Sequence, residues 1–195
     1  MRRSLRRFIM AALAISTAAA LAGCQPSADD SAGIAPQTMA DALHAVLESD
    51  RTVYTREVVN RLTVQQQVIE ASEHWKEEPA LPLPAQMFRM GAERVMEQDT
   101  GFSYALLSAW AINPQNAPRT EAEIAGLRFV AENEGQNFYA EETLGGQRYF
   151  TAVYADEAVA QACVACHNEH QDSPRRDFAL GDVMGGVVVR IALDE

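Results

Sequence analysis

The sequence is poor in cysteine and in basic residues. It has three cysteines among 195 residues, and two of them lie within one short segment, so no pair remains for a structural disulfide or for the second half of a zinc site. Lys76 is the only lysine, and acidic residues outnumber basic ones 27 to 16. Such a surface disfavours nucleic acid and anionic lipid as partners. The sequence also lacks internal repeats, a phosphate-binding loop and a Ser/His/Asp set.

No apolar run is long enough to span a bilayer, which takes ~20 residues. The run Phe8–Leu21 follows a basic start and ends in Leu21-Ala22-Gly23-Cys24. This pattern predicts a lipoprotein signal peptide over residues 1–23, with Cys24 acylated as the new N-terminus. Its removal leaves 12 basic and 27 acidic residues, a net charge of −15. We therefore expect a protein anchored by lipid on the periplasmic side of a bacterial membrane, with inner and outer membrane both open.

The residues after the signal peptide predict a tether and one domain. Residues 24–37 are small and polar and read as a flexible tether, and residues 38–195 form the domain. The domain is expected to be α+β, with an antiparallel sheet covered by helices. Its predicted elements are a helix from Thr38, a second helix from Thr63 to Trp75, an extended crossing over 79–84, a helix from Pro84 to Met96, a strand over 102–112, a helix over 121–133, a hairpin over 138–143 and 147–154, a short helix from Asp156 and a last strand over 183–193.

One motif carries chemistry, Cys163-Val164-Ala165-Cys166-His167. Two thiols three positions apart on a helical turn can each add to a haem vinyl group, and the adjacent His167 then ligates the iron. The alternatives are half a zinc site, which lacks a second Cys pair, and a thioredoxin-like dithiol, which lacks its βαβ setting. The motif therefore predicts a single covalently bound haem c, consistent with export.

Further segments resemble a known family: 82–84 (Pro-Leu-Pro), 112–116 (Ile-Asn-Pro-Gln-Asn), 163–168, Ser173-Pro174 and 181–183 (Gly-Asp-Val). Over about residues 38–193 the chain is similar to the Tll-type haem domain family, whose members are exported single-domain haem c proteins or sensory ectodomains of bacterial histidine kinases. The resemblance implies a PAS-like fold, one covalent haem and a redox or ligand-sensing role. We expect no effector domain after Leu193, so a signal would have to leave through a protein partner.

A bound haem needs an apolar wall and cations for its propionates. Candidates for the wall are Phe88, Met90, Trp110, Tyr149 and Phe150, each of which can equally be ordinary core. Candidates for the propionates are Arg51, Arg148, Arg175 and Arg176, because arginine suits bidentate carboxylate recognition.

The sixth iron ligand is predicted to be His44. At helical spacing His44 shares a face with Leu47, Arg51, Tyr54 and Val58, which offers a ligand, a cation and an apolar wall in line. The alternative is that His44 merely flanks the core. Met39 and Met90 are the next candidates, whereas His74 reads as a surface residue and His170 lies on the same short segment as His167.

Two functions from different classes follow. The first is redox or small-ligand sensing through a partner, and the second is periplasmic electron transfer. An enzyme such as a peroxidase needs a distal acid/base group that the sequence does not place, so we expect a protein without enzymatic activity.

Overall fold

The first helix begins at the edge of the predicted tether. The computed structural model describes residues 33–193, so the predicted signal peptide, Cys24 and most of the tether lie outside them. Helix α1 spans Pro36–Val53 and starts two residues before Thr38. Proline suits a first helical position because its missing N–H would have no partner there. Within residues 33–193 no helix is both long and apolar enough to cross a membrane.

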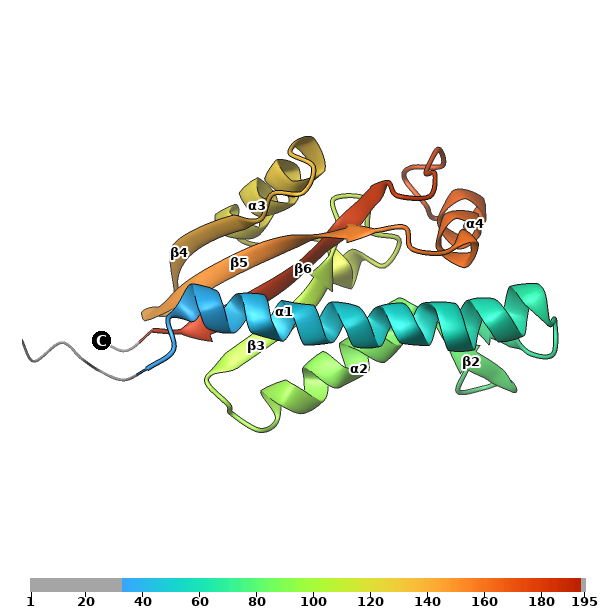
Figure 1. Ribbon diagram of the computed structural model, residues 1–195, viewed down its shortest axis with the longest axis horizontal. Coiled ribbons are helices and arrows are strands. Elements are labelled where there is room, and N and C mark those ends of the chain that lie inside the picture. Colours follow the sequence, from blue (N-terminus) through green and yellow to red (C-terminus); the bar gives the residue numbers. More distant parts are fainter. Residues whose placement is uncertain (1–32, 194–195) are drawn as a thin grey trace, which may run out of the picture. The chain divides into compact units, whose positions relative to one another are not determined.

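Helix α1 continues without interruption into the π-helical segment η1, Tyr54–Gln65 (Figure 1). The predicted second helix from Thr63 to Trp75 is wrong. The chain instead turns at Gln67, whose φ is 52°, and residues 70–72 become extended. The local capping pattern at Thr63 does not start a new helix, because the backbone of residues 70–72 forms its hydrogen bonds with another strand.

That partner is the proline-rich crossing, where the prediction of an extended chain is confirmed. Strand β1 (Glu70–Ser72) pairs in parallel with β2 (Ala80–Pro82). Helix α2 then spans Pro84–Met96 and begins at the predicted proline. The side chain of Gln86 accepts a hydrogen bond from the Leu83 N–H at 3.1 Å, which fixes the start of α2.

Four antiparallel strands form the main sheet in the order β3-β6-β5-β4, which confirms the predicted α+β class. They are β3 (Phe102–Leu107), β4 (Phe138–Leu144), β5 (Gln147–Glu157) and β6 (Val183–Ala192). The hairpin turns at Gly145 and Gly146, which have φ values of 61° and 90° that favour glycine. Strand β3 stops well before the predicted Ile112, because the Ser108 hydroxyl donates to the Met184 carbonyl and accepts from the Trp110 N–H.

Helices cover both faces of this sheet, and side chains alternate between them along β6. Helices α1 and α2 cover one face, and helix α3 (Glu121–Glu132) covers the other with its predicted capping box at Thr120 and Glu123. The core under α1 and α2 contains Ala40, Phe88, Ala152, Tyr154, Val187, Val189 and Ile191. The core under α3 contains Leu107, Leu127, Val130, Val153 and Val188.

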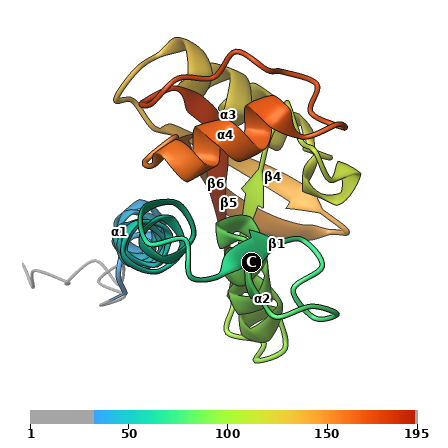
Figure 2. The ribbon, with the colours of Figure 1, turned by 90° about the vertical axis from the view of Figure 1, so that its right-hand side faces the viewer.

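The elements that build the site lie at one end of the sheet. Strand β5 ends in an irregularity at Asp156 and Glu157, and helix α4 (Gln161–Glu169) follows. The short helix expected from Asp156 ahead of the motif thus starts later and contains the motif itself. Helix α4, segment η1 and strand β1 face the viewer together when the molecule is seen from this end (Figure 2). A one-turn 3-10 helix, η2 (Pro114–Asn116), follows β3 at the predicted Asn-Pro turn.

Candidate cofactor site

Helix α4 presents the motif to a cavity. The buried Val164 anchors α4 in a small cluster with Ala158, Phe178 and Met184. Cys163 packs against this cluster and His167 contacts Phe178, and both line a cavity of about 850 Å³ together with Cys166. This volume is typical of cofactor sites, which occupy roughly 300–1,000 Å³.

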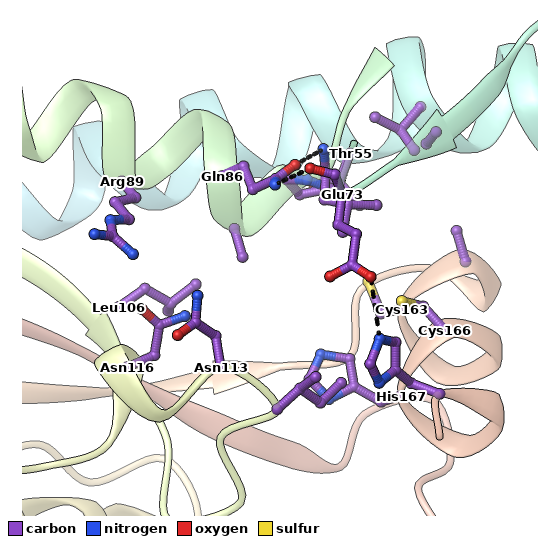
Figure 3. A pocket seen from close by; sticks show the side chains of 18 of the residues that line it. Thr55, Glu73, Gln86, Arg89, Leu106, Asn113, Asn116, Cys163, Cys166 and His167 are labelled. Atoms are coloured by element: carbon purple, nitrogen blue, oxygen red, sulfur yellow. Dashed lines mark hydrogen bonds and ion pairs between the residues drawn. The ribbon is translucent and has the colours of Figure 1, made fainter. Parts of the chain in front are cut away.

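The cavity wall comes from many separate parts of the chain (Figure 3). Besides α4, they include η1 with the end of α1, the β1–β2 segment, α2, and β3 with the turn after it, and the ends of β5 and β6 add Asp156 and Met184. Residues that contribute side chains from these parts include Thr55, Val59, Glu73, Gln86, Arg89, Met90, Leu106, Asn113 and Asn116. The wall thus mixes apolar side chains with a few polar ones, as ligand cavities usually do.

The two thiols are free, so both are available for covalent attachment. Burial raises the pKa of the Cys166 thiol, with the neighbouring Cys163, Glu73 and Glu169 acting in the same direction. The surroundings of Cys166 thus favour its neutral thiol form.

The imidazole of His167 is held in its neutral form. Burial lowers its pKa, and the electrostatic influence of Arg51 and His170 lowers it further. Its Nδ1 atom is buried and has no hydrogen-bond partner among the described residues. A neutral imidazole is the form that ligates a metal ion, so this residue fits the role of an iron ligand.

Arg51 is the one predicted propionate partner that lines the cavity. Its guanidinium forms an ion pair with Asp156, and only 12% and 10% of the two side chains are exposed. The Nε atom of Arg51 is buried without a partner among residues 33–193. Arg51, a residue of the cavity wall, thus keeps one buried donor without an acceptor among these residues.

The other two predicted cofactor contacts lie elsewhere. The Tyr54 hydroxyl donates to the Pro82 carbonyl at 2.7 Å and ties η1 to β2. The Arg175 guanidinium packs 4.2 Å from the ring centre of Phe178 and is paired with Asp177. Neither residue lines the cavity, because both side chains are already engaged with protein partners.

His44 is also outside the cavity. Its ring stacks on Tyr154 with the centroids 3.9 Å apart, over the sheet face that α1 covers. Met39 packs against the same core. The structure brings neither His44 nor Met39 to the motif, because the face of α1 that carries them packs on the sheet. Met90, by contrast, lines the cavity.

Of the predicted wall residues, Met90 alone lines the cavity. Phe88 is 3% exposed in the main core, and Phe150 packs against that core. Trp110 contacts Phe178 instead, at a ring distance of 5.9 Å. The remaining candidate cations are also engaged elsewhere, since Arg148 pairs with Glu141 and Arg176 donates to the Gln171 carbonyl.

The sequence reasoning missed most of the opposite wall. Thr55 and Val59 lie on η1, and Glu73 lies on the turn after β1, which was predicted to be helical. Asn113 and Asn116 lie in the Asn-Pro segment that supported the family resemblance, and this was the one available signal. Asn116 also holds the end of β3, since its carbonyl accepts from the Ser108 N–H at 2.9 Å.

The fold and the site together define an α+β protein with a cofactor cavity. Free thiols, a neutral imidazole and an arginine around one cavity fit a covalently bound haem with a propionate.

Comparison with known proteins agrees with this class. The model of the Tll0287-like family matches residues 29–192, so the chain belongs to the Tll0287-like family. The crystal structure of the cyanobacterial heme-protein Tll0287 has a similar fold, with a TM-score of 0.51 at 18% identity over 83% of this chain and 99% of that chain. No curated protein sequence matches the chain. Membership in this family, with its fold, relates the chain to a heme protein.

Proposed function

We propose that this protein is an exported, lipid-anchored c-type haem protein that senses redox state or a small ligand and signals through a protein partner. The observation that carries the haem assignment is the placement of Cys163, Cys166 and His167 together on the wall of one cavity of cofactor size. The cyanobacterial protein with the similar fold is a heme-protein, which supports the same cofactor here.

Attachment requires only the groups that the motif provides. Each thiol adds across one vinyl group, so that sulfur bonds to one vinyl carbon and the S–H hydrogen goes to the other. The addition needs no oxidant or reductant. It does need reduced cysteines, and both Cys163 and Cys166 are free.

Several residues would then hold the group. His167 would supply an imidazole nitrogen to the iron, and Arg51, which lines the same cavity, would supply a cation for a propionate. When bound, the haem supplies a one-electron redox centre whose potential depends on axial ligands and on burial.

Small-ligand sensing requires a position on the iron that a small ligand can take. The histidine predicted as sixth ligand stacks on Tyr154, and the predicted candidate that does line the cavity is the thioether of Met90. A thioether is a weaker competitor for a small ligand than a second imidazole. We propose a binding role without enzymatic turnover, on the periplasmic side of the membrane.

The attachment is tested by expression with c-type haem maturation, followed by denaturation and acid–acetone extraction. Wild-type protein should keep its haem, and the single variants Cys163→Ala and Cys166→Ala should each keep one thioether with a shifted absorption band. The double variant should lose all covalent haem. Complete release of haem from the denatured wild type would refute the proposal.

The role is tested by adding CO to the reduced protein. Rapid CO binding supports small-ligand sensing. A six-coordinate iron that does not bind CO instead supports a redox function. In that case, fast electron exchange with a soluble redox protein would support the alternative, an electron-transfer cytochrome.

A further inference from the structure

The imidazole of His167 is oriented by packing. Within residues 33–193 no hydrogen bond reaches its ring, and its buried Nδ1 has no partner. Metal-bound histidines usually donate this second N–H to a carboxylate or carbonyl, which fixes the ring. Here the imidazole instead contacts the Phe178 ring, with the two ring centroids 5.8 Å apart and the ring planes at 89°.

Phe178 is itself held by the residue that follows His167 in the motif. The Asn168 side chain accepts from the Phe178 N–H at 3.0 Å and donates to the Phe178 carbonyl at 2.9 Å. Both hydrogen-bonding groups of that backbone unit are therefore tied to the end of α4. These two hydrogen bonds bring the loop after the motif back to α4. As a result Phe178, which is 4% exposed, lies against His167.

The outer side of Phe178 is closed by two more groups. The Trp110 ring meets it edge-on at 5.9 Å, and the Arg175 guanidinium lies over it at 4.2 Å. Asp177 holds the Arg175 side chain at 2.7 Å. The Phe178 ring has contacts on several sides, so it can transmit a fixed orientation to the imidazole.

We propose that Asn168 and Phe178, which we call the Asn168–Phe178 clamp, are positioning residues that set the ring plane of His167 as an iron ligand. The proposal rests on the proposed haem function and deepens it. The plane of an axial imidazole sets its overlap with the iron orbitals, so the clamp controls the electronic state and the reduction potential of the haem. An Nδ1 without an acceptor also keeps the imidazole a weaker electron donor, which favours the reduced iron.

The test uses the haem-loaded full chain. Phe178→Leu keeps apolar bulk and removes the ring edge, and Asn168→Leu removes both hydrogen bonds. In both variants we expect a broadened or shifted low-spin EPR signal of the ferric haem and a shifted midpoint potential, with covalent haem content unchanged. Asn168→Asp keeps the acceptor for the Phe178 N–H and should lie between wild type and Asn168→Leu.

Matched controls exist in α3, where Asn133 donates to the Phe129 carbonyl at 2.8 Å and Phe129 packs on Phe138. Asn133→Leu and Phe129→Leu make the same chemical changes away from the cavity, and they should leave the EPR signal and the potential unchanged. Equal spectra in wild type, Phe178→Leu and Asn168→Asp would overturn the proposal, even if Asn168→Leu does not fold.

A haem-free measurement separates this proposal from the haem assignment. In the unloaded chain, the His167 ring protons should show a ring-current shift from Phe178, assigned by its absence in His167→Gln and lost in Phe178→Leu. If the wild type never carries covalent haem, the proposed function fails, yet this shift still reports on the clamp. If the shift is absent from the wild type, the clamp is wrong whatever the haem content.

Discussion

The guanidinium of Arg51 and the carboxylate of Asp156 form a two-bonded ion pair that joins α1 to the end of β5 at the cavity wall. One of its bonds, from Nη2 to Oδ2, is 3.1 Å long. Burial raises the pKa of Asp156, and the charge and hydrogen bonds of Arg51 oppose that rise. Arg51 therefore offsets part of the cost of burying this carboxylate beside the site.

Removing the cation should destabilise the fold. Arg51→Met leaves Asp156 buried without its partner, and we expect a loss of about 3–5 kcal/mol in the free energy of unfolding. Urea denaturation of the haem-free chain measures it. The control is Arg148→Met, whose exposed pair with Glu141 should be worth at most about 1 kcal/mol. Equal losses in both variants would contradict the assigned role.

The stability loss caused by Arg51→Met should depend on pH in a defined direction. An acid whose folded-state pKa is raised contributes stability below its unfolded pKa, and that contribution is lost as pH rises through the folded pKa. Without Arg51 the pKa of Asp156 rises further, so the loss caused by Arg51→Met should be smaller at about pH 4 than at about pH 7. A loss that grows towards acid pH would exclude this account.

The sixth iron ligand should respond to Met90 and not to His44. Met90→Ala removes the thioether that lines the cavity, so a six-coordinate low-spin spectrum should become high-spin. His44→Ala should leave the absorption spectrum unchanged, because His44 stacks on Tyr154 and does not line the cavity. A high-spin spectrum in His44→Ala alone would reverse this assignment.

Lipid anchoring at Cys24 remains a prediction from the sequence. Cys24→Ser should leave the precursor unprocessed or the protein free in the periplasm, since the thiol that carries the first lipid is gone. Intact mass of the membrane-extracted wild type decides the point. An unmodified Cys24, or a mature chain starting at Gln25, would rule out the anchor.

Gly126 in α3 should not tolerate a methyl group. A Cβ there would lie 2.5 Å from Val153 Cγ2 and 2.9 Å from Phe138 Cδ1, since the helix packs closely on the sheet. Gly126→Ala should therefore cost about 1–3 kcal/mol through overpacking, although helix propensity alone would give a gain of about 1 kcal/mol. Thermal unfolding measures the difference. The exposed Ala125→Gly provides the comparison, with an expected loss of about 1 kcal/mol from propensity.

Local signals predicted the elements that depend on local chemistry. Pro84 begins α2, the capping box of Thr120 and Glu123 begins α3, and the two glycines form the β4–β5 turn, all as expected. The π-helical continuation through Thr63 and the parallel pairing of β1 with β2 could not be read from the sequence. Both depend on hydrogen bonds between segments that only the folded chain brings together.

The sequence by itself determined the chemistry, because Cys163, Cys166 and His167 occupy one helical turn and their spacing needs no distant partner. Only the tertiary structure decided what surrounds them. One helix carries both His44 and Arg51, yet packing on the sheet places His44 against Tyr154, while Arg51 reaches the cavity and pairs with Asp156. Helical periodicity shows which residues share one face of the helix. Whether a residue on that face contacts the sheet or the cavity depends on where the sheet ends along the helix.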